Sequence, residues 1–320
     1  MSIVEIAKRV GVSCATVSRA LNNPEKVRPD TLARIRDACS ALDFRPRVVP
    51  NNIKVVCLAL SSPRHIYLSD SIIIRSAVAL LGQRDCQTSL ALLSELDTLP
   101  DMFRRAFIGF FHEDDEAVFP VVRRLAERAP FVAIGETTES VSPRVTCVGS
   151  DHAQGIGLAM SHFFERKHRR VGFVASGRTG RGYQERFEAY RQFMERENEY
   201  DDALVFRNDG RFMMEGLRRI CQAGATAMLI AESELTLQTL YFLEMLGKET
   251  PRDVSVIAIE GSGGPGFLYP PLTCVVQPLP QVAELAVNCL MDQMDGKPAP
   301  PKRRLTAPYG LAVRESVRTL

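Results

Sequence analysis

The residues from Ser13 to Asn22, S-C-A-T-V-S-R-A-L-N, combine a helix start with a row of small polar side chains. Ser13 is a favoured N-cap, because its hydroxyl can accept a hydrogen bond from a backbone N–H that has no partner inside the helix. Gly11, just upstream, permits a tight turn. By helical spacing, one face is apolar and buried, and the other is free to contact another molecule. The apolar face carries Val17, Ala20 and Leu21, and the free face carries Cys14, Ala15, Thr16, Ser18 and Arg19.

The free face has chemistry suited to a nucleic acid. Arg19 can pair with guanine O6 and N7 through two hydrogen bonds or bind a phosphate, and Thr16 and Ser18 can bond phosphate oxygens or base edges. A phosphate or solvent role without base specificity is an equally open interpretation for the two hydroxyls. The expected DNA-binding residues are Ser13, Cys14, Ala15, Thr16, Ser18, Arg19 and Asn22.

Two further helices are predicted around this segment. Ser2–Glu5 reads as a capping box that opens the first helix, and Pro29 and Asp30 suit the first turn of the third. A helix-turn-helix DNA-binding unit requires such a set, because its second helix must be held rigidly to enter the major groove. An ordinary three-helix bundle is the alternative. The expected shared core consists of Ile3, Ile6, Ala7, Val10, Val17, Ala20, Leu21, Leu32, Ile35, Cys39 and Leu42.

The N-terminal segment resembles the headpiece of the LacI/GalR family of bacterial repressors. The resemblance rests on Ile3–Asn22, Val27–Ile35 and Phe44–Pro46. It implies a transcriptional regulator that acts as a homodimer on a pseudo-palindromic, double-stranded DNA operator. It also places Cys14 and Ala15 where relatives carry their main specificity side chains, and such small side chains favour contact with thymine methyl groups.

Composition agrees with a DNA-binding arm on a larger body. Residues 1–54 hold ten Lys and Arg against five Asp and Glu, whereas the rest of the chain holds 30 against 33. This uneven charge is typical of a basic nucleic-acid-binding domain on a mildly acidic one. Eight cysteines without a C-x-x-C motif, and no apolar run near the ~20 residues of a membrane span, predict a reduced, cytoplasmic protein.

We expect three parts: a headpiece over residues 1–46, a linker over 47–52 and a two-lobed core over 53–320. Pro46 and Pro50 characterise the linker, since proline lacks the N–H that a helix interior needs. Relatives carry a hinge segment here that folds on DNA and drives a leucine into the minor groove. Only six residues separate Pro46 from the strand expected at Ile53, so that hinge helix is predicted to be missing.

From residue 53 onward, short apolar strands alternate with amphipathic helices. Such alternation predicts parallel strands joined by right-handed crossovers, hence doubly wound α/β sheets. Two series of similar length predict two lobes, with a ligand cleft at the carboxyl ends of the strands. The expected strands are 54–60, 87–93, 106–111, 131–134, 170–175, 203–206, 227–231, 254–259 and 272–276, and the expected helices are 69–82, 115–128, 151–166, 182–198, 210–223, 233–246 and 279–294.

This body resembles the periplasmic-binding-protein-like core of the same family. The matching stretches include Val148–Asp151, His168–Val174, Arg186–Tyr190, Pro251–Ile257 and Pro270–Thr273. The resemblance implies a small effector, a sugar or sugar derivative, that modulates operator affinity. The expected effector-binding residues are Tyr67, Asp151, Arg186, Glu232 and Glu260.

Each of these residues has a chemical rationale and an alternative. The planar fork of Arg186 can bond two ligand oxygens at once. Asp151 and Glu260 match acidic positions of relatives, and Glu232 replaces a common asparagine, which turns a mixed donor and acceptor into an acceptor and suggests a different ligand. Asp151 as a plain helix cap, and Glu232 and Glu260 as solvated loop residues, are the alternatives. Candidate aromatic platforms for a sugar are Tyr67, Phe111, Phe267 and Tyr269.

Several enzyme and cofactor motifs are rejected. Gly261–Gly266 fits G-x-G-x-x-G, but F-L-Y-P-P follows, so we expect no helix there to bind a pyrophosphate. The five histidines lack zinc-like spacing, and no G-x-S-x-G motif occurs. We therefore expect no cofactor, no metal and no catalysis. The remaining alternatives are a regulator with a non-sugar effector or none, a solute-binding module, and an enzyme on the same scaffold.

Overall fold

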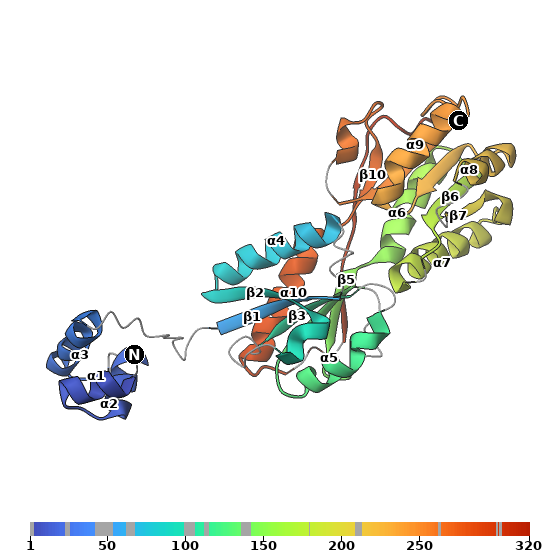
Figure 1. Cartoon of the computed structure of the whole chain (residues 1–320). Coiled ribbons are helices and arrows are strands. Elements are labelled where there is room, and N and C mark those ends of the chain that lie inside the picture. The colour runs from blue at the N-terminus through green and yellow to red at the C-terminus, as the bar shows by residue number, and fades with distance from the viewer. Residues whose placement is uncertain are drawn as a thin grey trace. The chain divides into compact units, whose positions relative to one another are not determined.

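The computed structural model describes residues 3–22, 26–41, 54–61, 68–98, 106–111, 115–135, 142–178, 180–208, 213–261, 264–298, 300 and 303–320. The chain forms two compact units, which are described separately (Figure 1). The small unit is formed mainly by residues 1–54, and the large unit holds nearly all of the rest. The linker predicted over residues 47–52, including the question of a hinge helix, lies outside the described residues.

The small unit is a three-helix headpiece, as predicted. Its helices are α1 (Ile3–Val10), α2 (Cys14–Asn22) and α3 (Pro29–Ala41). The buried core includes Ile6, Ala7, Val10, Val17, Ala20, Ile35 and Cys39, with Leu32 packed against it. The helix periodicity therefore identified the buried faces correctly. The side chains of Ile3 and Leu21, and all of Leu42, lie outside the described residues.

The first lobe of the large unit, the N-lobe, is built on a six-stranded sheet in the order β11-β5-β4-β3-β1-β2. Helices α4 (Leu68–Gly82) and α10 (Leu279–Met294) pack together. Helix α5 (Phe119–Ala126) joins the separate apolar cluster formed with Phe107, Phe111 and Phe131 of the sheet. The strands are β1 (Lys54–Leu60), β2 (Cys86–Leu92), β3 (Phe107–Phe111), β4 (Phe131–Gly135), β5 (Thr146–Ser150) and β11 (Arg304–Ala307).

The second lobe, the C-lobe, repeats this plan with a sheet in the order β12-β10-β9-β8-β6-β7. One apolar cluster joins α6 and α7 to the sheet, and another joins α8 and α9 to it. The strands are β6 (Val171–Ser176), β7 (Val205–Asn208), β8 (Ala227–Ile230), β9 (Ser255–Glu260), β10 (Thr273–Val276) and β12 (Gly310–Ala312). The helices are α6 (His152–Glu165), α7 (Arg181–Arg196), α8 (Met213–Gln222) and α9 (Thr236–Met245).

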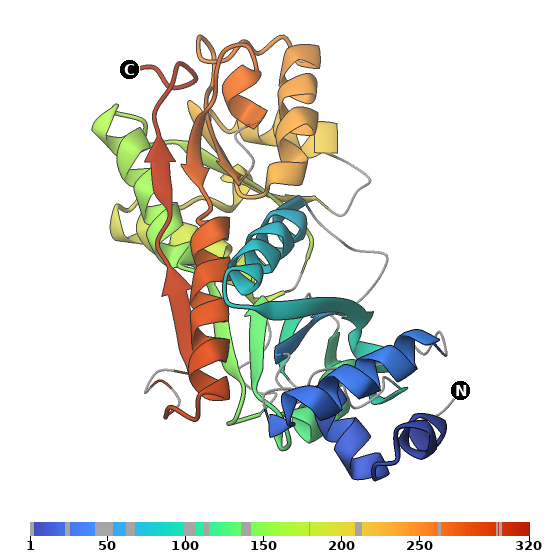
Figure 2. The same cartoon turned by 90° about the vertical axis from the view of Figure 1, so that its left-hand side faces the viewer.

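The described chain passes between the lobes at three places, after β5, after β10 and after β11 (Figure 2). Strands β11 and β12 follow each other closely, yet β11 pairs with β5 of the N-lobe and β12 pairs with β10 of the C-lobe. The three passages place the first residues of α6 and the turn after Ala307 at the junction of the lobes. The sequence patterns did not predict β5, β11 or β12.

The predicted doubly wound α/β architecture is confirmed, with local differences. Strand β1 and helix α10 have the predicted bounds. The helix predicted over 115–128 is instead a 3-10 turn, Asp115–Val118, followed by the shorter helix α5. Pro120 lies in the first turn of α5, where its missing N–H has no cost, so the helix begins there. Strand β7 begins later than predicted because Asp201 caps a 3-10 turn before it, accepting from the Ala203 N–H at 2.9 Å.

Candidate functional sites

The turn between α1 and α2 is built by two residues. Gly11 has a φ of 72°, a backbone conformation that disfavours residues with a Cβ, and ends α1 there. The Ser13 hydroxyl accepts a hydrogen bond from the Thr16 N–H at 3.1 Å, so the predicted N-cap of α2 is present. Val17 and Ala20 then anchor α2 in the headpiece core. The start of α2 is fixed by local chemistry, and its axis by packing.

Helix α2 presents the predicted small side chains to the surface. Cys14, Ala15 and Arg19 are exposed, and Thr16 and Ser18 are half-buried. The Thr16 hydroxyl lies 2.9 Å from the Ser13 hydroxyl, so Thr16 supports the cap as well as facing outward. Asn22 ends α2, but its side chain lies outside the described residues. The exposed end of the helix thus offers two small side chains and one guanidinium.

One stabilising contact in the headpiece was not predicted. The Arg34 guanidinium of α3 donates to the carbonyl of Val10, the last residue of α1, at 2.6 Å. The last carbonyls of a helix have no partner inside it, so this bond satisfies one of them and fixes α3 against α1. The sequence shows only that α3 carries a basic residue. It does not show the partner of that residue, because the partner depends on how the helices pack.

The second candidate site is a pocket between the two lobes of the large unit. Its volume is about 100 Å³, and its wall combines hydroxyl, carboxylate, amide, guanidinium and imidazole groups with the rings of a phenylalanine and a tyrosine. Polar groups of this mixture suit a ligand with several hydroxyls. The lining residues are Ser69, Asp70, Ile73, Phe111, Ile134, Gly135, Gly149, Ser150, His152, Tyr183, Arg186, Ser233, Glu234, Gln277, Leu279 and Val282.

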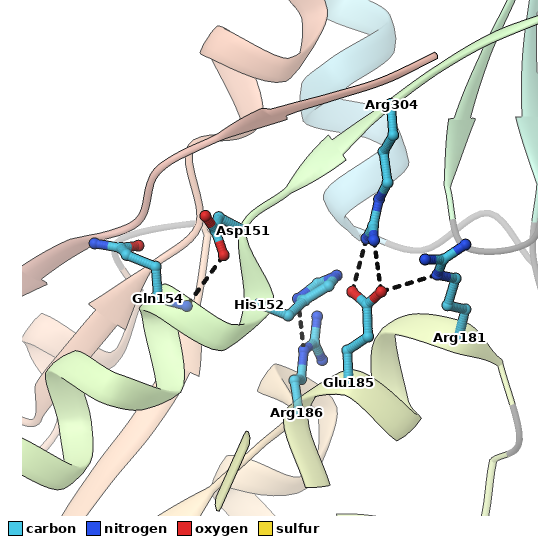
Figure 3. Close-up of polar contacts among 7 residues, drawn as sticks. All are labelled: Asp151, His152, Gln154, Arg181, Glu185, Arg186 and Arg304. Atoms are coloured by element: carbon cyan, nitrogen blue, oxygen red, sulfur yellow. Dashed lines mark hydrogen bonds and ion pairs between the residues drawn. The ribbon is translucent and has the colours of Figure 1, made fainter. Parts of the chain in front are cut away.

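Arg186 is the predicted effector residue that lines this pocket. It is almost fully buried, and its Nη1 donates to the carbonyl of Ala231 at 2.9 Å. Its Nε donates to Nδ1 of His152 at 3.1 Å, as Figure 3 shows. The Tyr183 ring lies 5.6 Å from the guanidinium carbon. The pKa of the Tyr183 hydroxyl is raised, chiefly by burial, so the phenol is neutral at physiological pH.

Asp151 is a helix cap, which is the alternative to its predicted role as a ligand contact. Its Oδ1 accepts from the Gln154 N–H at 3.1 Å and caps α6 (Figure 3). Asp151 faces a second hollow of about 800 Å³, on whose wall Glu185 and Arg304 also lie. It is not among the described residues that line the inter-lobe pocket.

In the second hollow an ion pair joins the lobes. The Glu185 carboxylate of α7 accepts from both terminal nitrogens of Arg304 on β11, at 2.5 and 2.7 Å. Arg181 donates to the same carboxylate at 2.8 Å, and Figure 3 shows the three groups converging. Burial alone would raise the pKa of Glu185, but the hydrogen bonds from Arg304 and Arg181 outweigh it and hold the pKa below its usual value.

The alternative of solvated loop positions for Glu232 and Glu260 is wrong, because both side chains are buried. Glu232 accepts from the N–H and hydroxyl of Ser176 at 2.6 and 2.7 Å, which ties the ends of β8 and β6 together. Glu260 is the last residue of β9. Its charge lies near the thiol of Cys274, and burial of that thiol together with this charge raises the pKa of Cys274 to about 11. Neither carboxylate is among the residues that line the inter-lobe pocket.

The aromatic residues predicted as a platform for a sugar differ in where they lie. Phe111 lines the pocket, Phe267 and Tyr269 project into solvent, and Tyr67 lies outside the described residues. The pocket residues that sequence reasoning missed include Asp70, His152, Tyr183, Glu234 and Gln277. Glu234 stands two positions after the predicted Glu232. The segment after β8 was therefore predicted correctly as part of the pocket wall, but the pocket is lined by Glu234 and not by Glu232.

Three observations concern the nucleotide, metal and membrane interpretations that the sequence argues against. The glycine-rich motif at Gly261 leads into a short 3-10 turn, Gly264–Phe267, rather than a helix. Within the described ranges, no three His, Cys, Asp or Glu side chains gather in a way that could hold a metal. No helix in the part of the chain that the structure describes is long and apolar enough to cross a membrane.

Comparison with known proteins agrees with both units. Residues 160–317 match the model of a periplasmic binding protein-like domain, and residues 2–47 match that of the bacterial regulatory proteins of the lacI family. The headpiece is thus a LacI-family helix-turn-helix domain, and the large unit contains a periplasmic-binding-protein-like domain. The headpiece model is that of bacterial regulatory proteins, and the curated relative described next is named a transcriptional regulator.

The similarity extends over nearly the whole chain. The HTH-type transcriptional regulator reg1 of Streptomyces lividans is 26% identical, over 93% of this chain and 91% of the relative. A structure of the regulator CelR in complex with cellobiose is 24% identical, covers 99% of both chains and gives a TM-score of 0.70. A Lac repressor dimer bound to operator and an anti-inducer is 17% identical, covers 99% of both chains and gives a TM-score of 0.77. At these identities the solved structures establish the fold.

Proposed function

We propose that this protein is a LacI-family regulator, namely a sequence-specific repressor whose two-lobed core binds a small polyhydroxylated effector that changes operator affinity. The observation that carries the DNA-binding part is α2, capped by Ser13 and presenting Cys14, Ala15 and Arg19 from a packed headpiece. A helix with this support can enter a major groove without losing its shape. Arg19 supplies the guanine or phosphate contact, and Cys14 and Ala15 supply apolar contact with thymine.

The test begins with the full-length protein and a pool of random duplexes, from which the preferred site is selected. Arg19→Ala should weaken binding to that site by roughly 1–3 kcal/mol, and wild-type affinity should fall steeply with salt. Arg36→Ala removes an exposed guanidinium from α3 instead and controls for bulk charge. Equal losses in the two variants, or none in Arg19→Ala, would remove α2 from the role of recognition helix.

For the effector, the support comes from the polar inter-lobe pocket and Arg186. A volume of about 100 Å³ is well below the ~300 Å³ or more of typical ligand sites. An effector must therefore bind with a change in the separation of the lobes, which couples occupancy to the shape of the core. Arg186, Asp70 and Gln277 supply hydrogen bonds, and Phe111 and Tyr183 supply aromatic surface.

A thermal-shift screen with sugars and purines tests this part, because a ligand that binds only the folded state raises its melting temperature. Arg186→Ala should abolish the shift and the response of operator binding to the sugar, and should leave operator binding without sugar unchanged. Arg186→Lys, which keeps the charge and loses the planar fork, should give most of the same loss. An unchanged response would exclude Arg186 from the site.

We also propose that the regulator is a homodimer and acts in the cytoplasm. Helix α9 exposes Leu237, Tyr241 and Met245, which follow one another at four-residue spacing and form one apolar stripe. Exposed apolar surface of this kind favours a protein partner, and a second copy also supplies the second headpiece that a two-fold operator requires. Tyr241→Glu should shift the sedimentation mass toward the monomer, whereas Gln238→Glu on the same helix should not.

The proposed division is a headpiece over 1–46, a linker over 47–52 and a core over 53–320. With so short a linker, we expect the core to set the spacing of two headpieces directly rather than through a folding hinge helix. A structure of the regulator on its operator with an ordered linker helix in the minor groove would contradict this expectation.

A further inference from the structure

We infer that His152 is a positioning residue that holds Arg186 in the orientation that binds the effector, with its Nδ1 unprotonated. The inference rests on the proposed function, because it gives one wall of the effector pocket a specific support. His152 is the first residue of α6, directly after the first passage between the lobes. Its side chain is buried and lines both the inter-lobe pocket and the second hollow.

The direction of the hydrogen bond fixes the state of the imidazole. A guanidinium has only donors, so the Nε–H of Arg186 can approach His152 Nδ1 at 3.1 Å only when Nδ1 carries a lone pair. The proton of the neutral ring is then on Nε2. The hydroxyl of Tyr309 lies 2.8 Å from the same Nδ1 and can donate to it. Two donors therefore face one acceptor, and a proton on Nδ1 would oppose the bond from Arg186.

The two described bonds of Arg186 orient a planar group from two sides. Nε is held by His152, and Nη1 is held by the carbonyl of Ala231 at the end of β8. Both acceptors are uncharged, so these bonds orient the guanidinium without neutralising it. The adjacent carboxylate of Glu185 is directed instead to Arg304 and Arg181 (Figure 3). An imidazole at position 152 thus supplies an uncharged acceptor beside the ligand-binding arginine.

The location of His152 also links this support to the passages between the lobes. Tyr309 stands at the third passage, and its ring lies 5.9 Å from the imidazole. Its backbone N–H and carbonyl both bond the side chain of Gln154, at 2.8 and 3.3 Å. The first turn of α6, which carries His152, and the Tyr309 segment are therefore held together.

The closing experiment compares three variants of the full-length protein. His152→Asn keeps an oxygen acceptor close to the position of Nδ1, and His152→Leu removes the acceptor at similar volume. Gln154→Leu removes the two side-chain bonds to Tyr309 from the same helix turn without touching Arg186. The probe is the member of a fixed panel, namely glucose, galactose, ribose, maltose and cellobiose, that gives the largest melting shift with the wild-type protein.

His152→Leu should weaken binding of that sugar about ten- to a hundredfold, as expected for loss of a hydrogen bond to a charged group. His152→Asn should remain within about threefold of wild type, Gln154→Leu should behave like His152→Asn, and operator binding without sugar should be unchanged in all three. Equal binding by His152→Leu and wild type would overturn the inference. Equal weakening by His152→Asn and His152→Leu would overturn it too, since a merely structural role would not distinguish an acceptor.

A second readout does not depend on any sugar. The chain has five histidines, so selective ¹⁵N labelling gives few imidazole signals, and the His152 signal is the one missing from His152→Asn. At pH 7.5 we expect an unprotonated Nδ1 and a protonated Nε2. A proton on Nδ1 would overturn the inference. If no sugar binds the wild-type protein, the proposed effector class fails, while the tautomer still decides the contact between His152 and Arg186.

Discussion

Replacing Glu185 by glutamine would test the ion pair between the lobes. In the wild-type protein one carboxylate receives two hydrogen bonds from Arg304 and one from Arg181. Glutamine keeps the shape but has one acceptor oxygen and no charge, so it cannot reproduce the two-point contact with Arg304. The variant leaves the guanidinium of Arg304 only about a quarter exposed and without its bidentate partner.

The magnitude follows from the burial of the pair. Exposed ion pairs contribute up to about 1 kcal/mol, and hydrogen bonds to charged groups about 1.5–3 kcal/mol where solvent is excluded. The side chains of Arg304 and Glu185 are 26% and 27% exposed, between these limits. We therefore expect Glu185→Gln to lower the unfolding free energy of the large unit by about 1–2 kcal/mol. For a domain of this size the melting temperature should fall by about 2–4 °C.

Far-UV circular dichroism is the suitable assay, since the chain contains no tryptophan. Glu188→Gln is the matched control, because Glu188 lies on the same helix and pairs with Arg191 in a more exposed position, within one lobe. We expect that control to lose clearly less stability than Glu185→Gln, because solvent screens an exposed ion pair. The lowered pKa of Glu185 adds a second criterion. The pair stabilises the fold above the ordinary carboxyl pKa and is lost as pH falls through the folded pKa, so the variant should be less sensitive to acid.

Equal stability of Glu185→Gln and Glu188→Gln at neutral pH would refute the reasoning. The ion pair would then contribute no more than a solvated surface contact, and the separation of the lobes would be set by other interactions. Equal acid sensitivity of Glu185→Gln and wild type would lead to the same conclusion.

Three further outcomes are expected. Ser13→Ala should destabilise α2 by about 1 kcal/mol through loss of its cap, seen as faster amide exchange in α2, whereas Ser18→Ala should keep the cap and the protection. Burial lowers the pKa of His168, so the large unit should lose stability as pH falls below about 6.5, the unfolded value; urea titrations of His168→Gln should show a shallower pH dependence. Gly155→Ala should lower the melting temperature, because a Cβ there would lie 2.8 Å from the Tyr309 ring, whereas Gly157→Ala meets no atom and should be tolerated.

The headpiece was predictable because its determinants are close in the sequence. The Ser13 cap, the Gly11 turn and the apolar spacing of α1 and α2 act within one or two helical turns. The same holds for the alternation of buried strands and amphipathic helices in the two lobes. Arg186 was selected from the matching arginine of the resembling family, and the structure shows only that it lines the inter-lobe pocket.

The inter-lobe pocket was only partly predictable. Its wall combines residues from α4, α7 and the first turn of α6 with the segment after β10, which are far apart in the chain. Asp70, His152 and Gln277 carry no local signal that distinguishes a pocket residue from a surface residue. Asp151 and Glu232 were assigned to the ligand from matching positions alone, whereas the structure gives Asp151 a backbone partner at Gln154 and Glu232 both groups of Ser176.

The sequence by itself determined a capped, basic helix-turn-helix segment followed by two α/β lobes, because helix caps, turn glycines and apolar periodicity act over a few residues. Only the tertiary structure decided which strands close the sheets and which charges meet. Strands β11 and β12 are separated by a short turn yet belong to different lobes, and Arg304 meets Glu185 across 119 residues. Such pairings depend on how whole sheets pack against their helices, so no local pattern in the chain could specify them.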